Sequence, residues 1–350
     1  MAESRIALAE GYTISRVLKG GWQLAGGHGA VAVEVAIADM DAFVEAGITT
    51  FDCADIYTGV ESLIGEYLRR LGRQHGPAAM SRVQVHTKCV PDLDVLASLT
   101  KGDVARMIER SLDRLGVERL DLVQLHWWND RVPRYVEAAC WLNDLRREGK
   151  IRHVGLTNFS TGQVDEIAAA GVPVVSHQVQ YSVLDRRPAG VMAARLAGLG
   201  IPLLAYGALA GGFLSEHWVN HPDPESTLDN RSLVKYRLII DEFGGWDRFQ
   251  SLLGLLGAIA RKHGVTIGTV AIRWVLQQQQ VAGVIVGARH ARHVAATRAV
   301  HDLTLDDDDL AVIQRAHLEA PGPSGDVYGL ERVVGGRHAA IMRYDLHRTG

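Results

Sequence analysis

Four polar side chains of different types follow short apolar segments in the first part of the chain. Asp52 and Tyr57 lie in "FDCADIYTG", Lys88 in "VQVHTKC" and His126 in "LDLVQLHWW". An ammonium group beside a phenol lowers the pKa of the phenol, and a carboxylate compensates the charge of a buried ammonium. The set could give a proton to an oxygen atom or remove one. It includes no nucleophile or metal cluster, so it suits the reduction of a carbonyl.

Each of these residues also has a purely structural interpretation. Asp52 could cap a turn before a helix, Lys88 could extend its ammonium to solvent, and His126 could be a hydrogen-bonded core histidine. For any one residue alone, the structural interpretation is the simpler one. Their shared position at the ends of consecutive predicted strands favours one common site.

The elements that must carry these residues alternate regularly. The predicted strands are 16–22, 48–53, 83–88, 120–125, 151–156, 174–180, 201–205 and 284–286. The predicted helices are 34–46, 61–71, 103–115, 132–148, 160–169, 188–198, 250–263, 266–279, 290–300 and 303–318. Helices supply the crossovers that consecutive parallel strands need. The pattern predicts an α/β protein with a single (β/α)8 TIM barrel, whose functional side chains stand at the carboxyl ends of its strands.

An open, doubly wound sheet is the alternative fold. It would place a glycine fingerprint at its first strand-to-helix turn, and neither G-x-G-x-x-G nor G-x-x-x-x-G-K-[ST] occurs in the chain. Two segments depart from the alternation. Residues 209–249 form a long, Pro- and Asp-containing loop after the seventh strand, and residues 321–350 form an extension. We therefore predict a barrel domain over 1–320 and a carboxyl-terminal tail over 321–350 that packs on or near it.

Composition excludes several other classes of protein. The chain has 37 basic and 40 acidic residues, a formal net charge of -3, and 47% hydrophobic residues. No basic run indicates a nucleic-acid partner, and no apolar segment is long enough to indicate a membrane span. The amino-terminal segment lacks the pattern of a secretion signal. Cys53, Cys89 and Cys140 are odd in number and lack C-x-x-C spacing, so we expect free thiols and a cytoplasmic location.

Six segments in order resemble the aldo-keto reductase family: "FDCADIYTGVESLIGEYL", "HTKC", "LDLVQLHWW", "VGLTNFS", "HQVQYSVLDR" and "AYGALAGGFL". The long loop and extended tail are most similar to its larger, channel-β-subunit-like bacterial members. The resemblance implies a barrel that binds an extended NAD(P)H, with Asp52, Tyr57, Lys88 and His126 as the catalytic set and Tyr57 as the proton donor.

The resemblance also implies a set of cofactor-binding residues. Asn158 and Gln178 would hold the nicotinamide carboxamide, and Tyr206 would lie against the nicotinamide ring. The segments "AYGALAGG" and "GARHARHVAAT" would bind the pyrophosphate and the adenosine end, through Gly207, Leu209, Gly211, Gly287, Arg289, His293 and Thr297. Family members commonly have other residues where His293 and Thr297 fall. We expect NADPH as the cofactor, with NADH as a possible second one.

The predicted partner is a small carbonyl or alcohol substrate, and the protein could be a monomer or a homo-oligomer. Trp22, Trp127 and Trp128 follow strand ends and could wall an apolar substrate pocket, with only one of the adjacent pair facing inward. His290 and His293 have the spacing of a metal pair, but no third ligand follows, and we predict no metal site. A cofactor-sensing binding subunit, similar to channel β subunits, is the alternative function.

Overall fold

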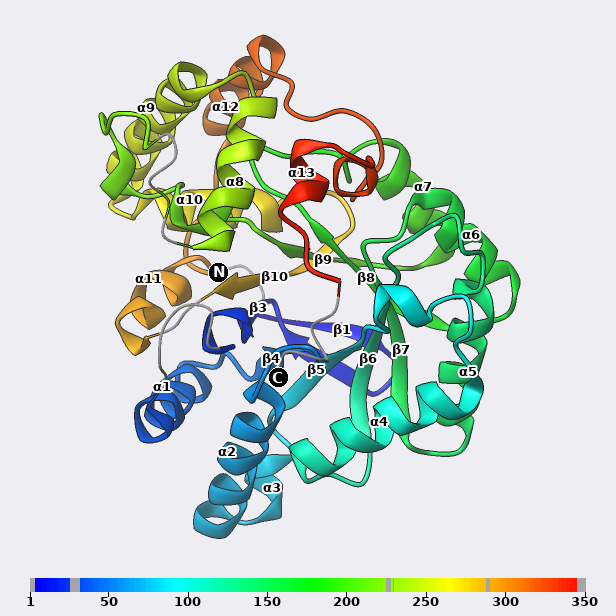
Figure 1. Ribbon diagram of the computed structural model, residues 1–350. Helices are drawn as coiled ribbons and strands as arrows, with labels where there is room; N and C mark the ends of the chain where they lie inside the picture. Colours follow the sequence, from blue (N-terminus) through cyan, green and yellow to red (C-terminus); the bar gives the residue numbers. More distant parts are fainter. Residues whose placement is uncertain (1–3, 26–31, 225–227, 229, 288–289, 345–350) are drawn as a thin grey trace.

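The computed structural model describes residues 4–25, 32–224, 228, 230–287 and 290–344. Eight parallel strands close into a barrel, and helices surround it (Figure 1). From β3 to β10 each strand pairs with the next one along the chain, and β10 closes the barrel by pairing with β3. The predicted (β/α)8 barrel is confirmed.

Every predicted barrel strand is present, with bounds that shift by a few residues. They are β3 (Val17–Gly20), β4 (Thr50–Asp52), β5 (Gln84–Cys89), β6 (Leu120–His126), β7 (Ile151–Thr157), β8 (Val174–Gln180), β9 (Leu203–Tyr206) and β10 (Val281–Gly287). Strand ends are set by local backbone geometry as well as by side-chain type, so their exact limits are the weakest part of a sequence-based prediction.

The predicted helices are also present and cover the outside of the barrel. They are α1 (Val33–Glu45), α2 (Val60–His75), α4 (Lys101–Leu115), α5 (Tyr135–Arg147), α6 (Thr161–Ala169), α7 (Val191–Leu199), α9 (Trp246–His263), α10 (Ile267–Leu276), α11 (Val294–Ala299) and α12 (Asp307–Glu319). Two short helices, α3 (Pro77–Met80) and α13 (Arg337–Ala340), were not predicted. No helix in the described part of the chain has the length and apolar character needed to span a bilayer.

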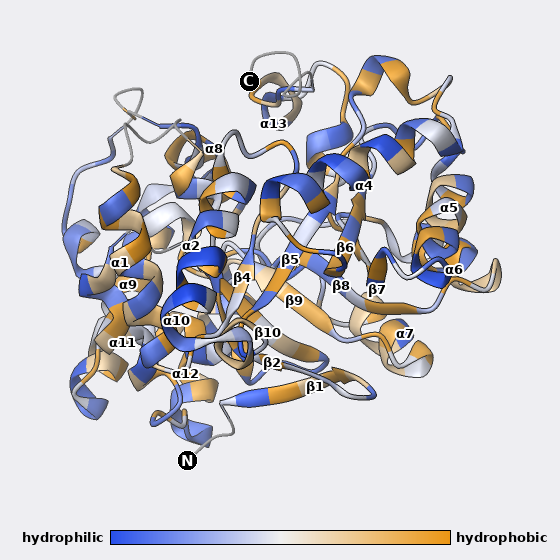
Figure 2. Ribbon diagram, turned by 90° about the horizontal axis from the view of Figure 1, so that it is seen from below, coloured by the Kyte–Doolittle hydropathy of each residue, from blue (hydrophilic) through white to orange (hydrophobic). Residues whose placement is uncertain are grey.

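A hairpin that the sequence did not indicate closes the amino-terminal end of the barrel. Its strands are β1 (Arg5–Ala9) and β2 (Tyr12–Ser15), which pair antiparallel. Tyr12 and Ile14 are buried against side chains inside the barrel, including Leu122 and Leu204. Figure 2 shows the hairpin and α13 at opposite ends of the barrel. The hairpin therefore covers the end of the barrel opposite to the carboxyl ends of the strands.

The long connection after the seventh barrel strand is confirmed, but it is not irregular throughout. It contains α8 (Arg231–Glu242), whose first turn is capped when Asn230 accepts a hydrogen bond from the Leu233 N–H. Tyr236, Ile239 and Ile240 form the buried face of α8. The spacing of these apolar residues is that of an amphipathic helix, which the Pro- and Asp-rich neighbouring sequence obscured.

The carboxyl-terminal segment lies near α8 at the open end of the barrel (Figure 1). After α12 it forms a 3-10 turn, η6 (Leu330–Arg332), and then α13. Buried residues of this segment, among them Val327, Tyr328 and Glu331, attach it to the barrel. The division of the chain into a barrel domain at 1–320 and a tail at 321–350 stays a prediction.

Candidate active site

A cavity of about 420 Å³ opens at the carboxyl-terminal end of the barrel. Asp52 is the last residue of β4, Lys88 lies near the end of β5, His126 is the last residue of β6, and Tyr57 lies in the loop after β4. All four side chains line the cavity. The fold thus brings together the four residues that the sequence singled out.

Lys88 and Asp52 form a buried ion pair. Lys88 Nζ lies 2.6 Å from Asp52 Oδ1 and donates a second hydrogen bond to the carbonyl of Cys53 at 2.8 Å. The two charged side chains are 7% and 5% exposed. Burial alone would lower the pKa of Lys88, but the attraction of Asp52 and of the Tyr57 phenol outweighs it and raises that pKa. Lys88 is therefore a fixed positive charge at neutral pH.

Tyr57 lies directly beside this charge. The ammonium of Lys88 is 5.0 Å from the centroid of the Tyr57 ring, and the Trp22 ring packs edge-on against Tyr57 with its centroid also 5.0 Å away. Burial raises the pKa of the Tyr57 hydroxyl, and Lys88 opposes that effect without cancelling it. From the sequence, the charge of Lys88 alone predicted a net lowering of this pKa. In the structure Tyr57 is a neutral phenol at pH 7, ready to donate its proton.

His126 is a neutral imidazole held between aromatic rings. Its ring centroid lies 4.3 Å from that of Trp128 and 5.3 Å from that of Tyr328, both edge-on. Burial and then the positive charge of Arg332 lower the pKa of His126 to about 3. Nδ1 lies 3.3 Å from the Thr157 carbonyl, which can only accept. In this ring orientation Nδ1 therefore carries the proton, and Nε2 is left to accept a hydrogen bond, as from an alcohol hydroxyl.

Two buried glutamines complete the layer beneath the cavity. Gln178 Nε2 and Gln124 Nε2 donate to Asp52 Oδ2 at 2.6 and 3.0 Å, and Gln178 also donates to Gln124 Oε1 at 2.8 Å. They orient the carboxylate that holds Lys88. Sequence reasoning missed Gln124, although its position two residues before His126 puts both on the inner face of β6. The predicted contact of Gln178 with a carboxamide stays a prediction.

The predicted nicotinamide side of the site lies next to this layer. Asn158, Tyr206, Gly207, Leu209 and Gly211 all line the cavity. Tyr206 donates a hydrogen bond from its hydroxyl to Asn158 Oδ1 at 2.9 Å. Asn158 has a φ of 63°, in the left-handed region that few residues other than glycine adopt. This turn directs its side chain toward Tyr206.

Helix α8 closes over the glycine-rich segment after β9. A Cβ atom at Gly207 would lie 2.3 Å from the Tyr236 hydroxyl, and one at Gly211 would lie 2.8 Å from the Tyr236 ring. Both glycines also have positive φ. On the opposite side, Trp22 Nε1 donates to Ser232 Oγ at 3.1 Å, so α8 is tied to both sides of the cavity. Glycine is required here because the backbone and the helix approach each other closely.

The residues predicted for the adenosine end are only partly placed at the cavity. Gly287 lines it, whereas His293 and Thr297 do not. His293 is exposed, and Thr297 is buried with its hydroxyl donating to the His293 carbonyl at 2.7 Å. Arg289 lies outside the described residues. Asp39 was not predicted near this segment, yet it accepts a hydrogen bond from the Ala291 N–H at 2.7 Å.

The tryptophans divide between the cavity and the core. Trp22 and Trp128 line the cavity. Trp127, which we also proposed for the substrate pocket, does not: it is fully buried in the core, and its indole N–H donates to the Val132 carbonyl at 2.9 Å. Adjacent residues at a strand end point to opposite sides, so only one could face inward. Sequence reasoning also missed the cavity walls that the tail supplies, Tyr328, Ile341, Met342 and Arg343.

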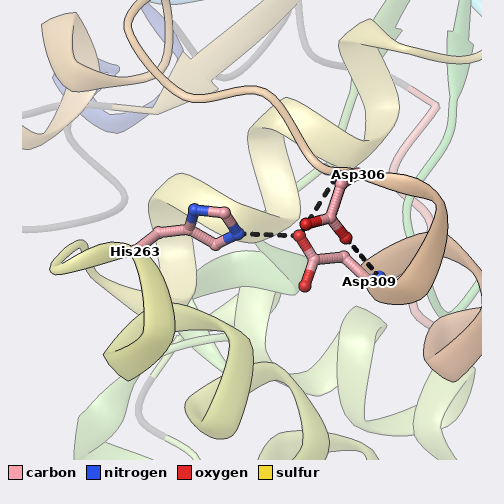
Figure 3. A group of neighbouring side chains, drawn as sticks. All are labelled: His263, Asp306 and Asp309. Atoms are coloured by element: carbon pink, nitrogen blue, oxygen red, sulfur yellow. Dashed lines mark hydrogen bonds and ion pairs between the residues drawn. The ribbon is translucent and has the colours of Figure 1, made fainter.

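One group outside the cavity has the composition of a metal site. His263, Asp306 and Asp309 bring ligand atoms within 4.8 Å of one another where α9 ends and α12 begins (Figure 3). Lys262 binds both carboxylates at 2.7 and 2.8 Å, and Asp306 caps α12 by accepting from the Asp309 N–H. Internal partners thus already engage both carboxylates. The group joins two helices and gives no indication of a metal.

Comparison with known proteins shows which proteins this chain resembles. Over 333 residues the chain is 26% identical to the NADH-specific methylglyoxal reductase of Escherichia coli (strain K12), covering 88% of this chain and 96% of that protein. It is 32% identical over 257 residues, or 63% of its length, to the flagellar radial spoke protein 5 of Chlamydomonas reinhardtii, of which it spans 48%. A crystal structure of an aldo/keto reductase from Klebsiella pneumoniae with NADP and acetate has the same fold, with a TM-score of 0.69, 22% identity, and coverage of 93% of this chain and 98% of that chain.

The profile of the aldo/keto reductase family matches residues 16–317, nearly the whole barrel. A match of this extent includes the strands that carry Asp52, Lys88 and His126 and the loop that carries Tyr57. The chain therefore belongs to the aldo/keto reductase family, a family of NAD(P)H-dependent oxidoreductases.

Proposed function

We propose that the protein catalyses the reversible reduction of a small aldehyde or ketone to an alcohol, with NADPH as its cofactor and Tyr57 as the general acid and base. The observation that carries this proposal is the buried Asp52–Lys88 pair beside Tyr57 in an open cavity. A protein that only senses the cofactor would not need a fixed ammonium beside a phenol, so the site favours an enzyme over a channel-β-like binding subunit. We place it in the cytoplasm, where its three free cysteines stay reduced.

The residues at the cavity fit a nicotinamide dinucleotide. Gly207 and Gly211 leave backbone free of side chains beside α8, as close approach to a pyrophosphate requires. Gln23 Oε1 is buried without a hydrogen-bond partner among the described residues, and Gln23 lines the cavity next to Gly287. When bound, the cofactor would supply the hydride that is exchanged with the carbonyl carbon. Asn158, Gln178 and Tyr206 would hold its nicotinamide end.

The chain's own residues then transfer one proton and stabilise the charge that this transfer leaves on Tyr57. In reduction, Tyr57 donates its hydroxyl proton to the substrate oxygen, and the nearby Lys88 stabilises the phenolate that results. Asp52 keeps Lys88 in place through the hydrogen bonds described above. After the transfer, the product hydroxyl can turn from Tyr57 and donate to His126 Nε2 as the alcohol leaves. In oxidation the same groups act in reverse, with Tyr57 as the base.

A substrate screen tests this function directly. Purified protein would be assayed for loss of NADPH absorbance with sugars, aromatic aldehydes, ketones and pyridoxal, and for its formation with alcohols. Turnover of one of these classes, abolished in a Tyr57→Phe and Lys88→Met double variant, supports the proposal. NADPH binding without turnover of any carbonyl or alcohol would instead support the binding subunit.

We expect residues 213–248 to form a lid that is protected when the cofactor binds. Helix α8 lies over Gly207 and Gly211, and its Ser232 accepts a hydrogen bond from the Trp22 indole N–H, so a bound cofactor would lie beneath it. Limited proteolysis with and without NADPH measures how far residues 213–248 are protected. Cleavage in this segment should slow at least severalfold with NADPH, and Trp22→Phe should speed cleavage in its absence. Equal cleavage in both states would contradict the lid.

We expect tighter binding of NADPH than of NADH. The segment "GARHARH" offers Arg289 and Arg292 for a 2′-phosphate, and a planar guanidinium binds such a group with two hydrogen bonds. Arg289 is the first choice, because it occupies the motif position that the family uses. Dissociation constants for both cofactors would be measured with the wild type and Arg289→Ala. Arg298→Ala is the control, since it removes an exposed arginine of α11 outside this segment. Equal binding of both cofactors, or no loss of NADPH affinity in Arg289→Ala, would refute the assignment.

A further inference from the structure

Arg332, in the tail, joins two of the loops that carry active-site residues. Its Nη2 donates to the backbone carbonyls of Trp127 and Asn158, each at 3.0 Å. Trp127 directly follows His126 at the end of β6, and Asn158 directly follows Thr157 at the end of β7. His126 and Thr157 are the last paired residues of the β6–β7 ladder. The guanidinium therefore links β6 and β7 one residue beyond the point where their pairing ends.

The backbone carbonyl of Asn158 requires the hydrogen bond that Arg332 donates. The ladder ends before Asn158, and its left-handed φ turns the chain, so its carbonyl needs a donor from elsewhere. Arg332 supplies that donor. The Asn158 N–H donates to the Gln178 carbonyl at 3.0 Å, and its side chain accepts from Tyr206. Arg332 thus completes the hydrogen bonding of a residue that we propose holds the cofactor.

Arg332 also supports one of the rings that enclose His126. Its guanidinium lies 5.1 Å from the centroid of the Tyr328 ring, and the Tyr328 ring contacts His126 edge-on. A cation over an aromatic face is attracted by it, and more strongly where water is excluded. The position of Tyr328 against His126 therefore depends on Arg332 as well as on packing.

The neighbouring residue fixes Arg332 in place. The carboxylate of Glu331 is buried and lies 3.4 Å from Arg187 Nη1 and 3.6 Å from Lys235 Nζ. Arg187 is paired in turn with the buried Asp185 at 2.7 Å. These ion pairs attach the tail to the loop after β8 and to α8. Breaking a buried pair is costly, so the turn that presents Arg332 is held rigidly.

The charge of Arg332 acts on His126. Among the described residues, no carboxylate forms an ion pair with Arg332, although Asp130, Glu331 and Asp326 act on it from farther away. Lys88 from β5 and Lys235 from α8 are the other cations that act on the imidazole. A positive charge on His126 would be repelled by all three cations. Arg332 is the strongest of these three influences on His126.

We propose that Arg332 is a positioning residue for the reaction: it holds the loops of His126 and Asn158 together and keeps the Tyr328 ring against His126. This inference rests on the proposed carbonyl reduction for its effect on rate, and on Asn158 alone for its effect on cofactor affinity. In this proposal the tail holds two active-site loops in position, in addition to lining the cavity.

The test compares Arg332→Met, which removes the hydrogen bonds and the charge, with Arg332→Lys, which keeps the charge. Arg337→Met is the matched control, because Arg337 lies in the same segment but is exposed and pairs with Asp241. Single-turnover NADPH oxidation would be followed at pH 7, with NADPH dissociation constants and thermal midpoints for each variant.

We expect Arg332→Met to slow the single-turnover rate about tenfold or more and to weaken NADPH binding about threefold, so that the loss of rate exceeds the loss of affinity. Arg332→Lys, whose ammonium can still donate to the Trp127 or Asn158 carbonyl, should recover part of the rate and of the affinity, and Arg337→Met should match the wild type. The proposal is overturned if Arg332→Met keeps the wild-type rate and NADPH affinity, or if Arg337→Met is equally impaired. If the wild type turns over no substrate, the proposed function fails, and an unchanged NADPH affinity in Arg332→Met then overturns the link to Asn158.

Discussion

Replacing Tyr57 with phenylalanine should lower turnover by roughly 10²–10⁴-fold, the usual worth of a positioned general acid, while the fold and NADPH binding are retained. The hydroxyl is the only part of the side chain that is lost, and the ring keeps its contacts with Trp22 and Lys88. No other described hydroxyl lies in the same relation to the Lys88 ammonium. The substrate oxygen would then have to take its proton from water.

The measurement is the rate of NADPH oxidation at saturating substrate, together with a solvent or substrate isotope effect that shows chemistry to be rate-limiting. Tyr135→Phe is a suitable control, because it removes a buried tyrosine hydroxyl on α5, outside the cavity, that bonds Glu166. Near-wild-type turnover of Tyr57→Phe under these conditions would exclude Tyr57 as the acid. A loss of NADPH binding in parallel would indicate a structural defect instead.

Much of the site could be predicted because, in a parallel barrel, the place of a residue at the end of a predicted strand also fixes the end of the barrel at which it lies. Asp52, Lys88 and His126 each end a run of buried β residues, and all strand ends of one kind meet at one rim. Their convergence therefore follows from the alternation of strands and helices. The pairing of Lys88 with Asp52 follows as well, since a buried ammonium requires a compensating charge.

The remainder depends on contacts between segments far apart in the chain. Nothing local in the sequence indicates that Tyr328 contacts His126 and that Arg332 binds the carbonyl of Trp127, or that Asp39 meets Ala291. The direction of the Tyr57 pKa shift could not be predicted from the sequence either, because it depends on how completely the phenol is buried. Helix α8 is a different case: its apolar spacing was readable, but the surrounding Pro and Asp residues favoured a loop.

The stability of the protein should fall steeply as the pH drops below about 6.5. Burial lowers the pKa of His126 to about 3 and those of His86, His177 and His317 to about 4. In the unfolded chain a histidine has a pKa near ~6.5, so between these values the unfolded state binds more protons than the folded one. Each histidine can then remove up to about 1.4 kcal/mol of stability per pH unit. The buried Asp55 works in the opposite direction, since burial raises its pKa, but the histidines outnumber it.

Urea denaturation at pH 8, 6.5, 5.5 and 4.5 would measure this loss as a fall in the free energy of unfolding. From pH 6.5 to 5.5 the fall should be several kcal/mol, a large part of the total stability of about 5–15 kcal/mol that folded proteins have. His317→Gln should flatten the dependence, because its amide can still reach the Val183 carbonyl that His317 contacts at 2.8 Å and does not titrate. Replacing the exposed His75 with glutamine should leave the slope unchanged. A free energy of unfolding that stays constant from pH 8 to 5.5 would show that the buried histidines are already protonated, or are partnered differently, in the folded protein.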